Sequence, residues 1–178
     1  VQLIQGLISY VKARPGLSQN EFAAVAADLM ESAGGRVRNM ALAKNLVISH
    51  IYPVEGNVKA LGLDYRKTPG QWREVQRTIK ENTVVIAGPL DLVQGGVGII
   101  ARFPVVIYPE GGLPAELWGL VSTVIDFNAF VQDVGLPSYQ AQYRLALIGR
   151  DGTGRDGEVF WGDPSVTGRD PVYLDVNL

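Results

Sequence analysis

The chain has 178 residues, of which 47% are hydrophobic and 19% are charged, and its formal net charge at pH 7 is -2. These values indicate one globular domain of ordinary size or two small lobes, and they exclude an intrinsically disordered chain. The slightly acidic balance lacks the basic footprint of a nucleic-acid-binding domain, so no nucleic-acid partner is expected. The absence of cysteine excludes disulfides, thiolate zinc sites and cysteine nucleophiles.

The sequence begins at Val1 rather than at methionine, so we expect it to be a piece of a longer protein. No apolar run reaches the roughly 18 residues that suggest a membrane span, and no signal-peptide pattern is present. Any membrane segment of the parent protein is therefore expected outside these residues. Residues 171–178 are typical of a strand that stops without a turn, so we expect the natural domain to continue.

Two amphipathic helices are predicted at the start of the chain. In residues 1–14 the apolar side chains share one helical stripe, which ends at a proline–glycine pair. The second helix begins with the pattern of a capping box, because Ser18 precedes Glu21 by three residues. Leu17 is placed to pack on Phe22, and a glycine pair ends this helix.

Strands and one further helix are predicted next. Branched and aromatic residues favour strands at residues 37–43 and 45–53. A helix is predicted from Thr68, with Pro69 at its first position and Gln71 three residues after the cap. The stripe that this helix is expected to bury consists of Trp72, Val75 and Ile79.

Strands dominate the rest of the chain. We predict strands at residues 83–87, 97–108 and 117–125. A short helix follows at residues 126–134, with Asp126 as its N-cap. A second, smaller sheet is predicted from segments 143–149, 158–162 and 171–178. Because strands run together rather than alternating strictly with helices, this order favours an α+β fold with antiparallel sheets.

A glycine cluster, Gly95, Gly96 and Gly98, raises the question of a phosphate-binding loop. A P-loop or a dinucleotide fingerprint would lead into a helix, and a P-loop would also carry a lysine. Here the cluster leads into a predicted strand. We therefore interpret it as a turn between two strands that requires positive φ.

The segment 149–158 alternates aspartate with glycine, as calcium loops do. Counted from Asp151, the third, fifth and twelfth positions hold Thr153, Arg155 and Gly162, which do not match an EF-hand. We predict a glycine-rich hairpin turn with solvated charges, and neither a metal nor a cofactor is expected.

His50 is the only histidine, so it cannot supply a multi-histidine metal site. A Ser/His/Asp triad stays open as an alternative, although no nucleophile elbow is present. Strand alternation places His50 on one face with Ile48 and Tyr52. A hydrogen-bonded pocket or core side chain is expected, with ligand contact as the alternative. The aspartates are scattered and define no acid–base pair.

Arg102 interrupts an apolar strand. Alternation places Phe103 and Val105 on one face, and Ile100 and Arg102 on the other. A guanidinium among apolar neighbours requires a partner or water. Two interpretations follow: an exposed or salt-bridged arginine, or a pocket cation for a ligand carboxylate or phosphate.

Several segments together resemble the CHASE domain, and the similarity runs from roughly Leu7 to the C-terminus. Its most specific elements are GLDYR, AGPLDLVQGG, ARFPV, WGLVS with VID shortly after it, and VFWGD. CHASE domains are the extracytoplasmic sensors of bacterial histidine kinases, diguanylate cyclases and phosphodiesterases, and of plant cytokinin receptors. The resemblance implies a sensor without catalytic activity in this fragment.

The resemblance also implies an architecture. It implies a helical stalk region at about 1–35, a membrane-distal PAS-like lobe with the ligand pocket at 36–136, and a membrane-proximal PAS-like lobe at 137–178, incomplete at its C-terminus. The break at Pro137-Ser138 is the expected lobe boundary. Flanking transmembrane helices and a homodimer through the stalk helices are implied as well.

Two positions can be compared with the plant receptors. There an acidic side chain binds the adenine and a threonine contacts the ligand tail. An ungapped alignment from the AGPL segment places the acidic position at Gln71 and the threonine position at Arg102. The turn is one residue shorter in this chain. An amide in place of an acid and a cation in place of a hydroxyl argue against adenine-type cytokinins, and they indicate a different, anionic small molecule.

The expected function is that of a periplasmic or extracellular ligand sensor whose parent signals through the membrane to a histidine kinase or a diguanylate cyclase/phosphodiesterase output. Two alternatives are a protein-interaction module and a hydrolase that uses His50 as base. No catalytic residue is assigned. The expected ligand-binding residues are Asn45, His50, Asp64, Tyr65, Gln71, Trp72, Gln94 and Arg102.

Overall fold

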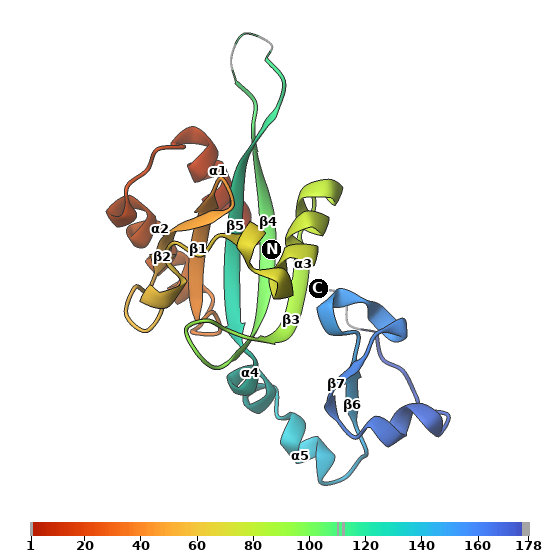
Figure 1. Cartoon of the computed structure of the whole chain (residues 1–178). Helices are drawn as coiled ribbons and strands as arrows, with labels where there is room; N and C mark the ends of the chain where they lie inside the picture. The colour runs from red at the N-terminus through yellow and green to blue at the C-terminus, as the bar shows by residue number, and fades with distance from the viewer. Residues whose placement is uncertain (1, 110, 112, 176–178) are drawn as a thin grey trace.

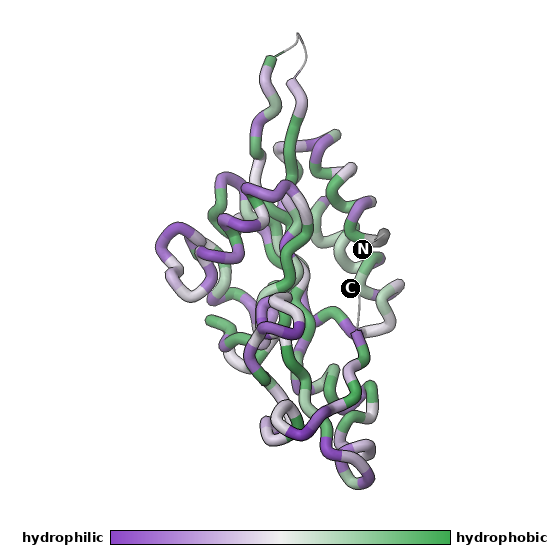
Figure 2. The backbone as a smooth tube through the Cα atoms, turned by 90° about the vertical axis from the view of Figure 1, so that its right-hand side faces the viewer, coloured by the Kyte–Doolittle hydropathy of each residue, from purple (hydrophilic) through white to green (hydrophobic). Residues whose placement is uncertain are grey.

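The computed structural model describes residues 2–109, 111 and 113–175. Its centre is a five-stranded antiparallel sheet with the order β2-β1-β5-β4-β3 (Figure 1). The strands are β1 (Asn39–Lys44), β2 (Val47–Tyr52), β3 (Val85–Asp91), β4 (Val97–Ile107) and β5 (Glu116–Asp126). This antiparallel sheet with few helices confirms the predicted α+β class. Figure 2 shows hydrophobic residues concentrated along its strands.

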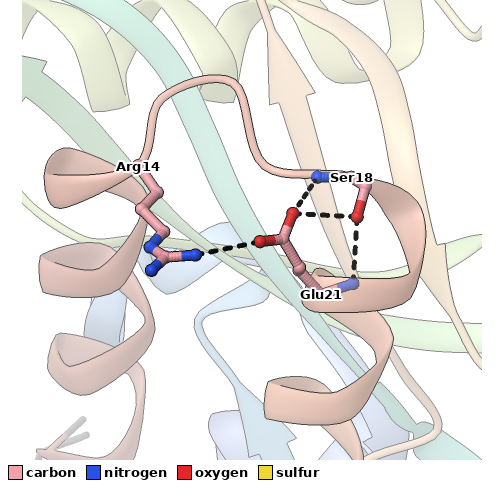
Figure 3. A network of polar contacts seen from close by, with 3 residues as sticks. All are labelled: Arg14, Ser18 and Glu21. Atoms are coloured by element: carbon pink, nitrogen blue, oxygen red, sulfur yellow. Dashed lines mark hydrogen bonds and ion pairs between the residues drawn. The ribbon is translucent and has the colours of Figure 1, made fainter.

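Helices α1 (Gln2–Ala13) and α2 (Gln19–Ser32) cover one face of the sheet. The predicted capping box is confirmed: the Glu21 amide donates to Ser18 Oγ, and the Glu21 carboxylate accepts from the Ser18 amide at 2.8 Å (Figure 3). Arg14 adds a 3.0 Å ion pair to Glu21. These helices and strands β1, β4 and β5 bury one cluster: Ile4, Leu7, Ile8, Val11, Leu17, Phe22, Ala26, Met40, Leu42, Phe103, Val105, Trp118 and Val121.

Helix α3 (Pro69–Glu81) and the 3₁₀ turns η1 (Val58–Ala60) and η2 (Tyr65–Lys67) cover the other face. The predicted stripe of α3 is confirmed, since Val75 is buried and Trp72 and Ile79 pack beside it. The predicted start is confirmed, with Thr68 as N-cap before Pro69, but the Thr68 side chain makes no capping bond and its hydroxyl donates to the Asp64 carbonyl at 2.9 Å. The buried residues of this cluster are Ala41, Ala43, Ile48, Ile51, Ala60, Tyr65, Val75 and Leu120.

A bulge in β2 changes which residues share a face. His50 and Ile48 pair with consecutive residues of β1, so Ser49 is an extra residue. His50 and Tyr52 therefore face α2, whereas Ile48 joins Ile51 on the α3 face. The prediction that Ile48 shares a face with His50 was wrong, because strict alternation does not allow for an inserted residue.

The chain leaves the large sheet through α4 (Phe127–Asp133) and α5 (Leu136–Gln140), which contains Pro137-Ser138. The predicted N-cap is confirmed, since Asp126 accepts from the Ala129 amide at 2.9 Å. A two-stranded antiparallel sheet follows, formed by β6 (Ala146–Ile148) and β7 (Val159–Gly162), before the 3₁₀ turn η5 (Pro164–Gly168). A third strand was predicted at 171–178. Residues 171–175 form none, and residues 176–178 lie outside the described residues.

The hairpin between β6 and β7 contacts the large sheet. It contains the 3₁₀ turns η3 (Arg150–Gly152) and η4 (Gly154–Asp156), so the predicted hairpin is confirmed. Its Asp151 carboxylate accepts from the Gly88 amide at 2.6 Å, and Arg77 donates to the Asp151 carbonyl at 3.1 Å. The expectation of solvated charges is therefore wrong for Asp151, which joins the small sheet to β3 and α3.

Candidate functional site

A small cavity lies on the α3 face of the large sheet. Its volume is ≈ 30 Å³, which is room for about one water molecule. Its floor is formed by β1, β2, β4 and β5, and its walls by residues 60–71 and by the turn at 92–94. The lining residues are Asn39, Ala41, Ile48, Ile51, Ala60, Leu63, Tyr65, Gln71, Leu92, Val93, Gln94, Ile100, Ser122 and Val124.

Arg102 is buried beside this cavity, behind residues that line it. Its residue is 0% exposed, and in the sheet it is paired with Ser122 of β5. One guanidinium nitrogen, Nη2, donates to Gln71 Oε1, and Cζ lies 5.1 Å from the centre of the Tyr65 ring. Its other two nitrogens, Nε and Nη1, are buried without a hydrogen-bond partner among the described residues.

The positive charge of Arg102 also lacks a carboxylate partner in the part of the chain that the structure describes. Glu74 lies one helical turn after Gln71 and is buried, yet it is not within ion-pair distance of Arg102. The interpretation of Arg102 as exposed or salt-bridged is therefore wrong. Because a buried unpaired cation with free donors is unfavourable, this arrangement favours an added hydrogen-bond acceptor or anion.

Three of the expected ligand residues line the cavity: Tyr65, Gln71 and Gln94. The Tyr65 hydroxyl lies 3.2 Å from Ser122 Oγ, at the end of the cavity that adjoins Arg102. Gln94 donates to Asn39 Oδ1 at 3.4 Å at another part of the lining. Sequence reasoning missed Asn39 and Ser122. Both could have been found by the criterion that singled out Arg102, since each is a polar residue within a predicted apolar strand.

Three other expected residues lie outside the lining. Asp64 accepts from the amide and the guanidinium of Arg66, and this side-chain hydrogen bond lowers the pKa of the Asp64 carboxyl. Trp72 packs half-buried against the α3-face cluster. Asn45 is exposed in the β1–β2 turn with a φ of 48°. Asn45 instead lines a second, wider pocket of ≈ 510 Å³ together with Lys44 and Trp118.

His50 lies on the opposite face of the sheet from the cavity. Its Nε2 contacts the Leu17 carbonyl at 3.0 Å, its Nδ1 contacts Ser49 Oγ at 2.9 Å, and its ring meets the edge of Phe22. Because a carbonyl can only accept, Nε2 is the donor in the first contact. His50 thus ties the α1–α2 turn to β2. Ser49 is within reach of this base, as the hydrolase alternative requires, but neither residue lines a described cavity.

The glycine turn at residues 92–96 forms one wall of the cavity. Gly95 and Gly96 have φ values of 90° and 79°, so the predicted positive-φ turn is confirmed. Arg38 fastens the turn by donating to the Gly95 carbonyl at 2.8 Å. Gly98 has a different role, because a Cβ there would lie 2.8 Å from the Leu92 side chain. These glycines therefore shape the cavity wall.

Solved structures of similar fold include the following two. One is the ligand-binding domain of the Pseudomonas aeruginosa PAO1 amino-acid chemoreceptor PctC in complex with GABA (TM-score 0.61, 12% identity, 92% of this chain and 68% of that one). The other is an extracellular ligand-binding receptor from Desulfohalobium retbaense DSM5692 (TM-score 0.52, 19% identity, 74% of this chain). The chain spans only 25% of the length of that receptor. The search of curated proteins found no significant match.

Among the residues that the structure describes, no helix combines the length and the apolar character needed to cross a bilayer.

The comparison with protein families identifies a family for this chain. The model of the CHASE domain matches residues 8–161, which is most of the chain and includes the whole large sheet and all but the last residue of the small one. The chain therefore belongs to the CHASE-domain family of extracytoplasmic sensor domains.

Proposed function

We propose that this domain senses a small organic anion, which binds in the cavity beside Arg102. The observation that carries this proposal is the pair of buried guanidinium nitrogens, Nε and Nη1, that lack a partner in the described structure. Such groups are rare in folded proteins, because each buried unsatisfied donor costs about 1–3 kcal/mol. A carboxylate or phosphate of a ligand would supply both the missing acceptors and the missing negative charge.

The lining of the cavity favours an organic ligand over an inorganic ion. Apolar side chains make up most of it, and the polar groups are few, which is the usual composition of small-molecule sites. The two similar structures are described as ligand-binding receptors, and one contains GABA. Their low identity makes this a likeness of fold, and the proposal for this chain rests on its own residues.

The cavity must enlarge to hold such a ligand. Its ≈ 30 Å³ compares with roughly 300–1,000 Å³ for typical small-molecule pockets. The structure thus corresponds to a closed, ligand-free state in this proposal. The turn at 92–96 and the segment at 60–65 are the walls that would move apart, and the ligand would stabilise the open arrangement by binding it more tightly.

The signal would pass to α1, which we propose as part of a stalk. Helix α1 packs on the face of the sheet opposite the cavity, against residues such as Phe103 that neighbour Arg102 in β4. A change around Arg102 therefore reaches α1 through a single strand. Residues 1–35 would form the stalk region, 36–136 the membrane-distal lobe and 137–178 the membrane-proximal lobe.

In this proposal the domain lies in the periplasm or outside the cell, and its parent protein is anchored in the plasma membrane by other segments. The parent would form a homodimer through the stalk helices and carry a histidine kinase or a diguanylate cyclase/phosphodiesterase. The exposed face of α1, which includes Gln5, Ser9 and Lys12, is available for such a contact. The fragment itself would have no catalytic activity.

Arg102→Met tests the proposal through stability and binding together. Because methionine removes an unpaired buried charge, we expect the variant without ligand to be as stable as wild type or more stable, by about 1–4 kcal/mol. A thermal-shift screen with acetate, butyrate, 4-hydroxybutyrate, succinate, 4-aminobutyrate and phosphoenolpyruvate should raise the melting temperature of wild type with at least one anion. Arg102→Met should not respond to that anion.

Arg66→Met is the matched control, because Arg66 is an exposed arginine outside the cavity lining. It should keep the response of wild type. An equal response in Arg102→Met would contradict the proposed role of Arg102. A strong loss of stability in Arg102→Met without ligand, together with no anion response in wild type, would assign Arg102 to structure alone. Purified periplasmic protein that binds wild type without any anion response would instead favour the protein-interaction alternative.

A further inference from the structure

The cavity has a second polar region besides the one at Arg102. It consists of Asn39, which is 1% exposed at the start of β1, and Gln94 in the 92–96 turn. The Gln94 amide donates to Asn39 Oδ1 at 3.4 Å, a long contact. This bond leaves the amide protons of Asn39 and the carbonyl oxygen of Gln94 free of a hydrogen bond within the pair. The pair therefore offers both a donor and an acceptor.

The sheet register separates the two polar regions. Asn39 lies in the row that continues through Val124 and Ile100, whereas Arg102 lies in the neighbouring row on the same face, with Ser122. Asn39 and Arg102 are thus two strands and two residues apart, which corresponds to about 12 Å between their Cα atoms. The floor between them is apolar and is formed by Ala41, Ile100 and Val124. A ligand that spans the cavity would be polar at both ends and apolar between them.

The lining residues also indicate which charge a ligand group can carry at the second region. None of the lining residues carries an aspartate, glutamate, lysine or arginine side chain. Two charged groups near this turn, Arg38 and Asp126, pair with each other at 3.8 Å, and Arg38 also donates to the Gly95 carbonyl. An ammonium or a second carboxylate next to Asn39 and Gln94 would therefore lose its hydration without gaining a free counter-charge, which is unfavourable. A hydroxyl or a carboxamide would lose little, because both can donate to Gln94 and accept from Asn39.

From these observations, and resting on the proposed function, we infer the class of the ligand. It is a short monocarboxylate that carries a neutral hydrogen-bonding group, a hydroxyl or a carboxamide, at its far end. Arg102 binds the carboxylate, and Asn39 and Gln94 select the neutral group. Because strand side chains stand roughly perpendicular to the sheet, their tips keep a separation of about 12 Å, and two hydrogen bonds of about 2.9 Å each leave about 6 Å, the span of a backbone of about four carbon atoms.

Calorimetric titration with four compounds of one length tests this inference: butyrate, 4-hydroxybutyrate, succinate and 4-aminobutyrate. Wild type should bind 4-hydroxybutyrate roughly three- to tenfold more tightly than butyrate, which corresponds to one added hydrogen bond. The compounds with a second charge should bind more weakly than 4-hydroxybutyrate. Gln94→Ala and Asn39→Leu should bind 4-hydroxybutyrate and butyrate with affinities within about twofold of each other, so that the preference of wild type is lost.

Gln94→Ala is the primary variant, because Gln94 is partly exposed in a turn and its truncation spares the sheet. Equal affinity of wild type for butyrate and 4-hydroxybutyrate would overturn the inference, as would a preference that survives in Gln94→Ala. Tightest binding of succinate or 4-aminobutyrate would overturn it too. Binding of phosphoenolpyruvate alone, dependent on Arg102, would overturn the inference and leave the proposed function standing. No binding of any anion would overturn both.

Discussion

The large-sheet region (residues 2–131) and the small-sheet region (residues 132–175) are held together by different means. Every residue of the three hydrophobic clusters belongs to the large-sheet region. None of residues 132–175, all of which the structure describes, is buried. Because apolar burial is the dominant source of folding stability, the difference shows that the large-sheet region supplies a firm frame for the cavity, while the small-sheet region depends on individual contacts.

The contacts of the small-sheet region are few and specific. Phe160 meets the edge of Phe127 at a ring separation of 6.0 Å, and Asp151 binds the Gly88 amide. The neighbour of Gly88, Ala87, pairs with Ile100 in the floor of the cavity. The small-sheet region is therefore fastened to β3, whose neighbour β4 contributes Ile100 to the floor of the cavity.

The largest expected effect separates the two regions directly. Phe22→Ala removes a fully buried ring from the core of the large-sheet region and should lower the free energy of unfolding by about 3–5 kcal/mol. Phe160→Ala, at a partly exposed ring of the small-sheet region, should lower it by less than about 2 kcal/mol. Urea denaturation followed by circular dichroism measures both. Equal losses would contradict the contrast in burial.

A second effect concerns the turn that forms a cavity wall. Gly96→Val places a branched side chain at a φ of 79°, which should cost about 1–3 kcal/mol in the free energy of unfolding. Gly96→Asn is the control, because asparagine tolerates the left-handed region better. Thermal melts should rank wild type first, the asparagine variant second and the valine variant last. A valine variant as stable as wild type would show that the turn does not require glycine there.

A third effect tests how the two regions are joined. Asp151→Ala leaves the Gly88 amide without its acceptor and should lower local stability by about 1 kcal/mol. Hydrogen exchange should become faster at Gly88 and across residues 145–162, while β1 and β5 keep their protection. Asp156→Ala, a change at an exposed residue of the same hairpin, should leave exchange unaltered. If Asp151→Ala also leaves it unaltered, the contact does not fasten the small sheet.

The smallest expected effect is a dependence on pH. A hydrogen bond from the Ser165 side chain lowers the pKa of Asp163, and one from Arg155 lowers the pKa of Asp175. A carboxyl whose folded pKa lies below its unfolded value stabilises the fold above the unfolded pKa and loses that contribution as pH falls through the folded pKa. Exchange in the small-sheet region should therefore quicken modestly below about pH 4. Asp163→Asn and Asp175→Asn together should reduce this change, and an unchanged acid response would contradict the assignment.

Local sequence patterns predicted local structure well. Ser18 and Glu21 lie three residues apart, as do Asp126 and Ala129, so their caps depend on one helical turn and could be predicted. At Thr68 the helix start was predicted, but the side chain makes no capping bond, and Gln71, three residues later, accepts from Arg102. A helix start thus follows from neighbouring residues, whereas the hydrogen bonds of its side chains depend on distant partners.

Features that depend on distant partners could not be predicted in the same way. The bulge at Ser49 is set by the register with β1, and a third strand was expected at 171–178 from β-propensity without a known partner. At the candidate site, Arg102 could be singled out from the sequence because it is a charged residue within an apolar strand. Its contact with Gln71, 31 positions earlier, and the face it shares with Ser122 followed only from the paired strands and the packing of α3.

The central claim is that the free donors of Arg102 bind the anion of the ligand. The most direct measurement is the nuclear magnetic resonance signal of the Arg102 Nε–H group, assigned by its loss in Arg102→Met, during titration with 4-hydroxybutyrate. The account predicts that this signal shifts and saturates with the same Kd as calorimetry gives, while the Nε–H signal of Arg66 stays in place. Binding of 4-hydroxybutyrate in calorimetry with an unmoved Arg102 signal would contradict the claim.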